Sequence, residues 1–225
     1  MTQGLAEVLP FAIGVAVVPI PIVAVIAMLF SSRARVNAPL FVVGWMAGLA
    51  ALCTAVYAVA DAADAAGDEA ASDGVSWLRI GFGILLLAGA VRAWRKRPAP
   101  DATPELPPWV ALVDSVSPWK ALGLGAVLSS LNPKNLLLVV GAAAGLAQLG
   151  LASADAVVAL AVFVVVGSLG VLVPVGYFFL AGERAAARLD DARSWLAFHS
   201  SAIVTVLLLV FGVLLVATGL GPLGE

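Results

Sequence analysis

The chain has almost none of the side chains on which redox, metal or nucleophilic chemistry usually depends. Its 225 residues include one cysteine, Cys53, and one histidine, His199. A single cysteine excludes an intramolecular disulfide and a Cys-x-x-Cys redox pair, and no spacing of His, Cys and carboxylates resembles a metal site. The sequence also has no nucleophile with a neighbouring base, no phosphate-binding glycine loop and no nucleic-acid-binding surface. We therefore predict that the protein is not an enzyme, and that it uses no cofactor, no metal and no nucleic acid.

Charged residues are scarce as well. They make up 12% of the chain, whereas 62% of the residues are apolar and the mean hydropathy is +1.08. Soluble domains do not have this composition, and a transmembrane helix needs about 20 mainly apolar residues. Six segments qualify, of which the third is the shortest, and they leave no room for a soluble domain. The sequence predicts an all-α integral membrane protein, one transmembrane domain over 1–225, with helices at about 5–30, 39–60, 76–91, 120–149, 154–181 and 195–220 and a cytoplasmic linker at about 92–119.

Lysine and arginine are absent from two connections between these segments, the acid-rich 61–75 and the short 150–153. Basic residues follow the first, third and fifth segments instead, and the positive-inside rule places those connections in the cytoplasm. The first segment has no basic region before it and exceeds the roughly 7–15 apolar residues of a signal peptide, so we expect a retained helix. We predict a multi-pass protein of the plasma (inner) membrane with both termini outside the cytoplasm. The basic residues are Arg33, Arg35, Arg92, Arg95, Lys96, Arg97, Arg184, Arg188 and Arg193.

This topology makes helices 1–3 and helices 4–6 cross the membrane in opposite senses. Each half opens with a long apolar segment that proline interrupts near its middle, at Pro19-Ile20-Pro21 and at Asn132-Pro133. Proline has no N–H and clashes with the preceding turn, so it leaves helix carbonyls without a partner. Paired broken helices at matching positions are typical of transporter binding sites, although proline also makes ordinary kinks. We predict a 3+3 inverted repeat in which helices 1 and 4 are broken.

No Asp or Glu lies within the central apolar stretches, but one lysine does. Lys134 follows Asn132-Pro133 and is 14 residues from both Lys120 and Gln148, about 21 Å along a helix, which disfavours snorkelling to an interface. A charge at this depth costs about 2.5–3.5 kcal/mol and is by default a functional-site hypothesis. Lys134 could bind carbonyls freed at the break, pair with an anionic substrate, or exchange protons as a partly neutral amine. We take pairing with an anionic substrate as the working hypothesis.

Small residues mark places where helices can approach closely. Two Gly-xxx-Gly motifs occur, at 44–48 and 141–145, and Gly123 and Gly125 precede the break in the fourth segment. Such motifs favour close helix packing, either within the chain or in a homodimer.

These features together resemble the LysE-type exporter superfamily over the entire chain. The shared features are six helices, Pro19-Ile20-Pro21-Ile22, Arg33 and Arg35 before 41–45, and the sequence Asn132-Pro133-Lys134-Asn135-Leu136. Within that superfamily the chain most resembles the GAP family of actinobacteria, also called Sap or sulfolipid-addressing proteins. The resemblance implies a motif for substrate binding that consists of Pro19, Pro21, Asn132, Pro133, Lys134 and Asn135.

The same resemblance implies a function in export of glycolipids or peptidoglycolipids to the cell envelope, or in helping that process. The leading hypothesis is an exporter or flippase-like transporter whose partners are membrane lipids and an anionic or zwitterionic lipid-like substrate. The wider superfamily exports amino acids and metal ions, so such an exporter is the first alternative. The second alternative is a non-transporting scaffold that recruits lipid-synthesis or export proteins through its basic loops.

Overall fold

The computed structural model describes residues 1–65, 69–95 and 116–220, and every regular element in these ranges is a helix. The predicted all-α class is therefore confirmed for the described residues. Most of the predicted cytoplasmic linker, 96–115, lies outside them. The helices are α1 (Thr2–Ala16), α2 (Pro19–Leu29), α3 (Ala34–Ala65), α4 (Glu69–Arg95), α5 (Pro118–Ser130), α6 (Pro133–Ala147), α7 (Ser153–Gly167), α8 (Leu169–Ala181) and α9 (Ala185–Leu220), with a 3₁₀ turn at Gly182–Arg184.

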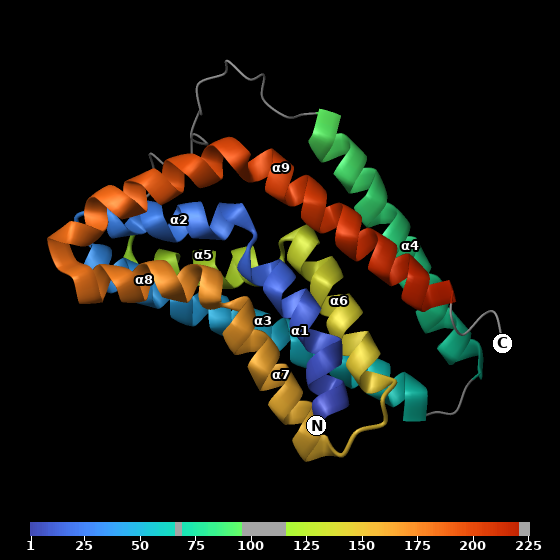
Figure 1. The fold of residues 1–225 in the computed structure, drawn as a ribbon. Helices are drawn as coiled ribbons and strands as arrows, with labels where there is room; N and C mark the ends of the chain where they lie inside the picture. Colours follow the sequence, from blue (N-terminus) through green and yellow to red (C-terminus); the bar gives the residue numbers. More distant parts are fainter. Residues whose placement is uncertain (66–68, 96–115, 221–225) are drawn as a thin grey trace.

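Three of the predicted membrane segments are bent helix pairs. The axes change direction by 52° between α1 and α2, by 59° between α5 and α6, and by 56° between α7 and α8. Breaks in the first and fourth segments were predicted, whereas the prediction of one continuous helix over 154–181 was wrong. The three bends lie near one another in the middle of the molecule, and the long helices α3 and α9 run past them (Figure 1). The fold therefore has two arms, one with α1, α6 and α7 and the other with α2, α5 and α8.

The number of membrane crossings depends on how these bent pairs are counted. Among the described residues, α3 and α9 are each long and apolar enough to cross a membrane, and the three bent pairs raise the total to as many as five. The described part of α4, the predicted third crossing, does not meet the same criterion of length and apolar composition. Membrane insertion is thus supported by the helices, and the sixth crossing stays a prediction.

Several helices extend beyond the apolar stretches that predicted them. The helix α9 begins at Ala185 rather than near 195, and only 66–68 separate α3 from α4 in place of the predicted loop 61–75. Hydropathy marks the part of a helix that fits the hydrocarbon, but the helix itself continues into the polar region. The turns with Arg33 and Arg184 lie at one end of the molecule, away from both termini (Figure 1). The orientation of the chain across the membrane stays a prediction.

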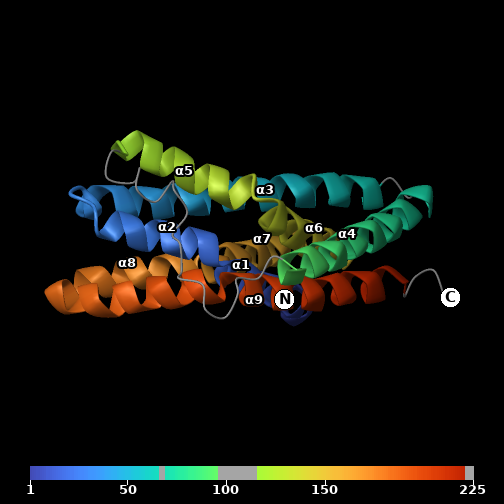
Figure 2. The ribbon, with the colours of Figure 1, turned by 90° about the horizontal axis from the view of Figure 1, so that it is seen from above.

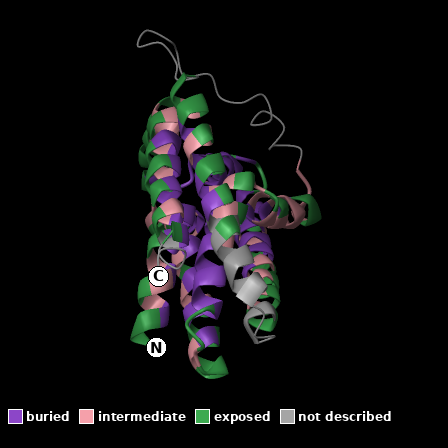
Figure 3. Ribbon diagram, turned by 90° about the vertical axis from the view of Figure 1, so that its right-hand side faces the viewer, coloured by how far each residue is buried: buried purple, intermediate pink, exposed green. Residues whose placement is uncertain are grey.

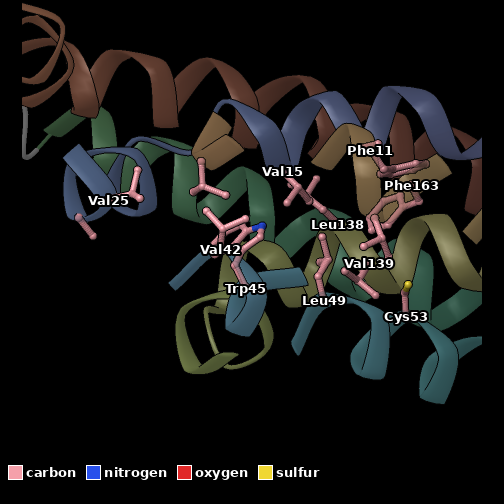
Figure 4. Packing of buried hydrophobic residues seen from close by; sticks show 14 of the residues in the cluster. Phe11, Val15, Val25, Val42, Trp45, Leu49, Cys53, Leu138, Val139 and Phe163 are labelled. Atoms are coloured by element: carbon pink, nitrogen blue, oxygen red, sulfur yellow. The ribbon is translucent and has the colours of Figure 1, made fainter. Parts of the chain in front are cut away.

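The core lies between the two arms and the long helices. Phe11, Val15, Leu49, Leu138 and Phe163 come from four different helices and face one another (Figure 4). Buried residues line the interior of the bundle, and exposed residues cover its outer side (Figure 3). Many of those exposed residues are large and apolar, as a surface in contact with lipid requires.

Glycines allow α3 and α5 to pack side by side (Figure 2). A Cβ atom at Gly44 would collide with the Leu122 carbonyl oxygen, and one at Gly125 would collide with the Phe41 carbonyl oxygen, whereas Gly123 has open space around it. Gly48 of the first motif also faces α5, and the second motif, 141–145, packs against α1 and α9. Both Gly-xxx-Gly motifs therefore serve packing within the chain, and neither is left free for a second copy.

Candidate functional site

The break between α5 and α6 is formed by Asn132-Pro133. Asn132 has an extended backbone with φ −71° and ψ 119°, because a residue before proline is driven out of the helical region. Pro133 is the first residue of α6, where its missing N–H leaves no bond unmade. The Asn132 side chain caps the new helix, since its Oδ1 accepts a hydrogen bond from the Lys134 N–H at 3.1 Å. Pro133 thus begins a helix. The sequence had instead predicted that it interrupts a helix from within.

Asn135 joins the two half-helices. Its side chain is fully buried, and its Nδ2 donates to the carbonyl oxygens of Leu128 at 3.2 Å and Ser129 at 3.3 Å. These carbonyls belong to the last turn of α5, which has no following helical turn to supply donors. Asn135 therefore fixes the bend between α5 and α6.

The break between α1 and α2 is made by Val18-Pro19 and contains no polar side chain. Val18 has φ −63° and ψ 120°, Pro19 is the first residue of α2, and no side chain caps the helix. Pro19 and Pro21 are both buried, and neither has an N–H that needs a partner. The two proline breaks therefore share a backbone shape and differ in chemistry.

Lys134 lies where the two breaks meet. Its side chain lines a narrow crevice together with Val18 of the first break, Leu86 of α4 and one face of α9. The crevice has a volume of about 10 Å³, which is room for about one water molecule. No carboxylate lines it, and no ion pair of Lys134 occurs among the described residues. The lining residues are Val18, Leu86, Lys134, Leu138, Val204, Leu207, Leu208 and Phe211.

The surroundings of Lys134 favour an anion. Lys134 is the second residue of α6, and the N-terminus of a helix carries a partial positive charge. A lysine ammonium at that end adds to this potential, while the walls of the crevice are apolar and supply no compensating charge. Helix N-termini are common binding sites for phosphate, sulfate and carboxylate groups.

The structure thus separates the six residues predicted as one motif. Lys134 faces the crevice and Pro19 adjoins it through Val18, whereas Asn132 and Asn135 hold the α5–α6 break. Pro21 is buried within α2, and Pro133 is exposed. The sequence did not reveal the α4 and α9 walls of the crevice, because their apolar residues resemble any others in a membrane helix.

The third bend, between α7 and α8, is centred on Gly167-Ser168. The buried Ser168 hydroxyl donates to the Val164 carbonyl oxygen at 2.6 Å, the type of bond that bends helices. Gly170 then meets the end of α1, where a Cβ atom would collide with the Ala16 carbonyl oxygen. The bend lets the fifth segment, α7–α8, pack along both halves of the first segment, α1–α2. The Gly-Ser pair was the signal for it, since such pairs are a known cause of kinks.

Comparison with known proteins gives one match over nearly the whole chain. The family described as SfLAP, Sap, sulfolipid-1-addressing protein, matches residues 8–221. No curated protein and no solved structure shows a significant match. The matched range includes both proline breaks, Lys134 and all the walls of the crevice, and the family is the one that the motifs resemble. The chain therefore belongs to the Sap, sulfolipid-1-addressing protein family.

Proposed function

We propose that this protein moves, or helps to move, an anionic lipid-like molecule such as a glycolipid or peptidoglycolipid to the cell envelope, and that Lys134 binds its negative charge. The observation that carries this proposal is the position of Lys134, a lysine without a carboxylate partner among the described residues, where two broken helices meet. The description of the family, which names a sulfolipid, supports a lipid as the molecule concerned.

The closed crevice suggests that the described conformation is an occluded one. With a volume of about 10 Å³ it cannot hold a lipid head group, so one wall must move before a substrate can reach Lys134. Helix α4 packs along α9 and touches α3 and α6 only slightly (Figure 1). We propose that the α4–α9 pair is the wall that moves, in an alternating-access cycle around the two broken helices.

The packing of the helices supports the 3+3 inverted repeat. In this repeat, α1–α2 of the first half corresponds to α5–α6 of the second half, α3 corresponds to α7–α8, and α4 corresponds to α9. The contact of α1–α2 with α7–α8 then becomes the contact of α5–α6 with α3, and both contacts are extensive. The bend in α7–α8 has no counterpart in the unbroken α3, so the two halves differ in shape at this point.

The test is the surface lipid profile of cells that lack the gene, rescued by wild type, by Lys134→Gln or by Lys120→Gln. Lys120 is the matched control, because it is also near the N-terminus of a half-helix but is exposed to solvent. We expect one lipid class to disappear from the surface and accumulate inside, and to return with wild type and Lys120→Gln but not with Lys134→Gln.

Two other results would contradict the proposal in different ways. Unchanged surface lipids in the deletion strain would remove lipid as the substrate, and export of amino acids or ions would be the function to test. Full rescue by Lys134→Gln would remove the Lys134 site and favour a scaffold that acts through its basic loops.

A further inference from the structure

A groove between α3 and α7 is a hollow among the described residues that the proposed function does not use. Its volume is about 620 Å³, within the range of about 300–1,000 Å³ for ligand sites. Most of its walls are apolar. The lining residues are Ala50, Cys53, Thr54, Tyr57, Asp61, Leu151, Ser153, Ala156, Val157, Leu160, Ala161, Val164 and Val165.

The polar residues of the groove gather at one of its ends. Gly167, at the end of α7, packs near Leu49, and Ser153, at the start of α7, lines the groove with Asp61, so α3 and α7 are antiparallel. Tyr57, Asp61 and Ser153 therefore share one end, while the opposite end is apolar. The twelve residues from Ala50 to Asp61 span about 16 Å of helix, close to half of the roughly 30 Å hydrocarbon core of a bilayer. The groove thus has the length and polarity profile of one leaflet.

The polar end presents acceptors for hydroxyl groups. The Tyr57 hydroxyl donates to Asp61 Oδ1 at 3.2 Å, and Asp61 forms no ion pair with the described residues. The carboxylate has further lone pairs that accept hydrogen bonds from hydroxyls. Its negative charge repels a phosphate or sulfate group at the same place. This end therefore favours a sugar or polyol over an anionic head group.

We propose that the groove holds one hydrocarbon chain of a membrane lipid, with a hydroxylated head group hydrogen-bonded at Tyr57 and Asp61. This inference rests on the proposed function in one respect, namely that the lipid held is one that the protein carries. In the predicted orientation the polar end lies in the outer leaflet, so the groove is where a lipid leaves the protein sideways. Lys134 and Asp61 then recognise different parts of the lipid, its negative charge and its hydroxyl groups.

The experiment measures how fast a cysteine at the polar end reacts with a water-soluble maleimide. Ser153→Cys is made in the full chain with Cys53→Ala, which removes the one native cysteine, and Ala154→Cys is the control because residue 154 is exposed beside the groove without lining it. The protein is placed in phosphatidylglycerol vesicles with added glucosyl diacylglycerol, or with added diacylglycerol of the same acyl chains.

We expect glucosyl diacylglycerol at about five times its dissociation constant to slow labelling at 153 about sixfold, because only the unoccupied fraction reacts. Diacylglycerol, which has no sugar, is expected to give much weaker protection, and Ala154→Cys is expected to react at the same rate with both lipids. Tyr57→Phe keeps the aromatic ring but removes the hydroxyl that holds Asp61, and it should abolish most of the protection at 153.

Equal protection by the two lipids would overturn recognition of hydroxyl groups, and no protection by either would overturn the groove as a lipid site. Different results would contradict the proposed function, so the two proposals can be distinguished. Lys134→Gln should keep the protection at 153 while it abolishes lipid export in cells. Protection together with unchanged surface lipids in the deletion strain would leave a lipid site in a protein that does not export lipid.

Discussion

The two proline breaks solve the same backbone problem in opposite ways. At α1–α2, Val18 is followed by Pro19 and Pro21, so the new helix begins with few N–H groups and uses no polar side chain. At α5–α6, Asn132 caps the new helix and Asn135 bonds the carbonyls of the old one. The first break has fewer N–H donors to pair, whereas the second supplies an acceptor for the Lys134 N–H and a donor for two unpaired carbonyl oxygens.

The difference shows where the chemistry of the fold is located. A break formed by apolar residues can bend a helix and supply a wall, but it offers a substrate no charge. The polar break adds Lys134 beside its two asparagines, and that lysine is not needed for the bend, because Asn132 and Asn135 already supply the bonds. Lys134 is thus the residue whose presence stability does not explain.

The largest expected effect is at the apolar break, where α8 meets the end of α1. Gly170→Ala would place a Cβ atom against the Ala16 carbonyl oxygen, so the helices must separate. We expect the free energy of unfolding to fall by about 2–3 kcal/mol, measured by unfolding of the purified protein in detergent. Gly176→Ala in the same helix is the control, because its Cβ would meet nothing within 4 Å. Equal losses in both variants would show that the contact with Ala16 does not matter.

The polar break should be sensitive to loss of its buried amide. Asn135→Leu keeps the size of the side chain but leaves the Leu128 and Ser129 carbonyls without their donor. The expected loss is about 2 kcal/mol in the same unfolding measurement. Ser130→Ala should have a much smaller effect, since the Ser130 hydroxyl bonds a carbonyl within its own helix. A stable Asn135→Leu protein would mean that other groups satisfy these carbonyls.

Loss of the helix cap should cost less. Asn132→Ala removes the acceptor for the Lys134 N–H, and we expect a loss of about 1 kcal/mol. Asn132→Ser can still accept that bond and should recover most of the stability. If serine is no better than alanine, then the cap is not what Asn132 contributes.

The smallest effect is expected at Lys134, with the opposite sign. Lys134→Met removes a positive charge from the positive end of α6, so the free energy of unfolding should rise by about 0.3–1 kcal/mol, while lipid export is lost. Lys120→Met, at an exposed site near the start of α5, should leave stability nearly unchanged. A clear loss of stability in Lys134→Met would instead indicate that the ammonium is bonded to carbonyls of the break.

The sequence predicted those parts of the fold that depend on neighbouring residues along the chain. Apolar length marked the helices, and the missing N–H and steric clash of proline marked the breaks at Pro19-Ile20-Pro21 and Asn132-Pro133. The bend at Ser168 was missed although its signal, the Gly167-Ser168 pair, is local and the Ser168 hydroxyl bonds a carbonyl of its own segment. Asp61 was assigned to a solvated loop, since hydropathy does not indicate which face of α3 meets α7. The crevice around Lys134 could not be predicted from the sequence for the same reason.

The contact between Ala16 and Gly170 has a mechanical consequence. Because α8 rests on the end of α1, the bend in α1–α2 cannot change its angle alone without separating these residues or straining α7–α8. Val18 and Lys134 link the remaining bend to the first across the crevice. The three bends are therefore in contact with one another, and we expect a movement of one of them to be transmitted to the other two.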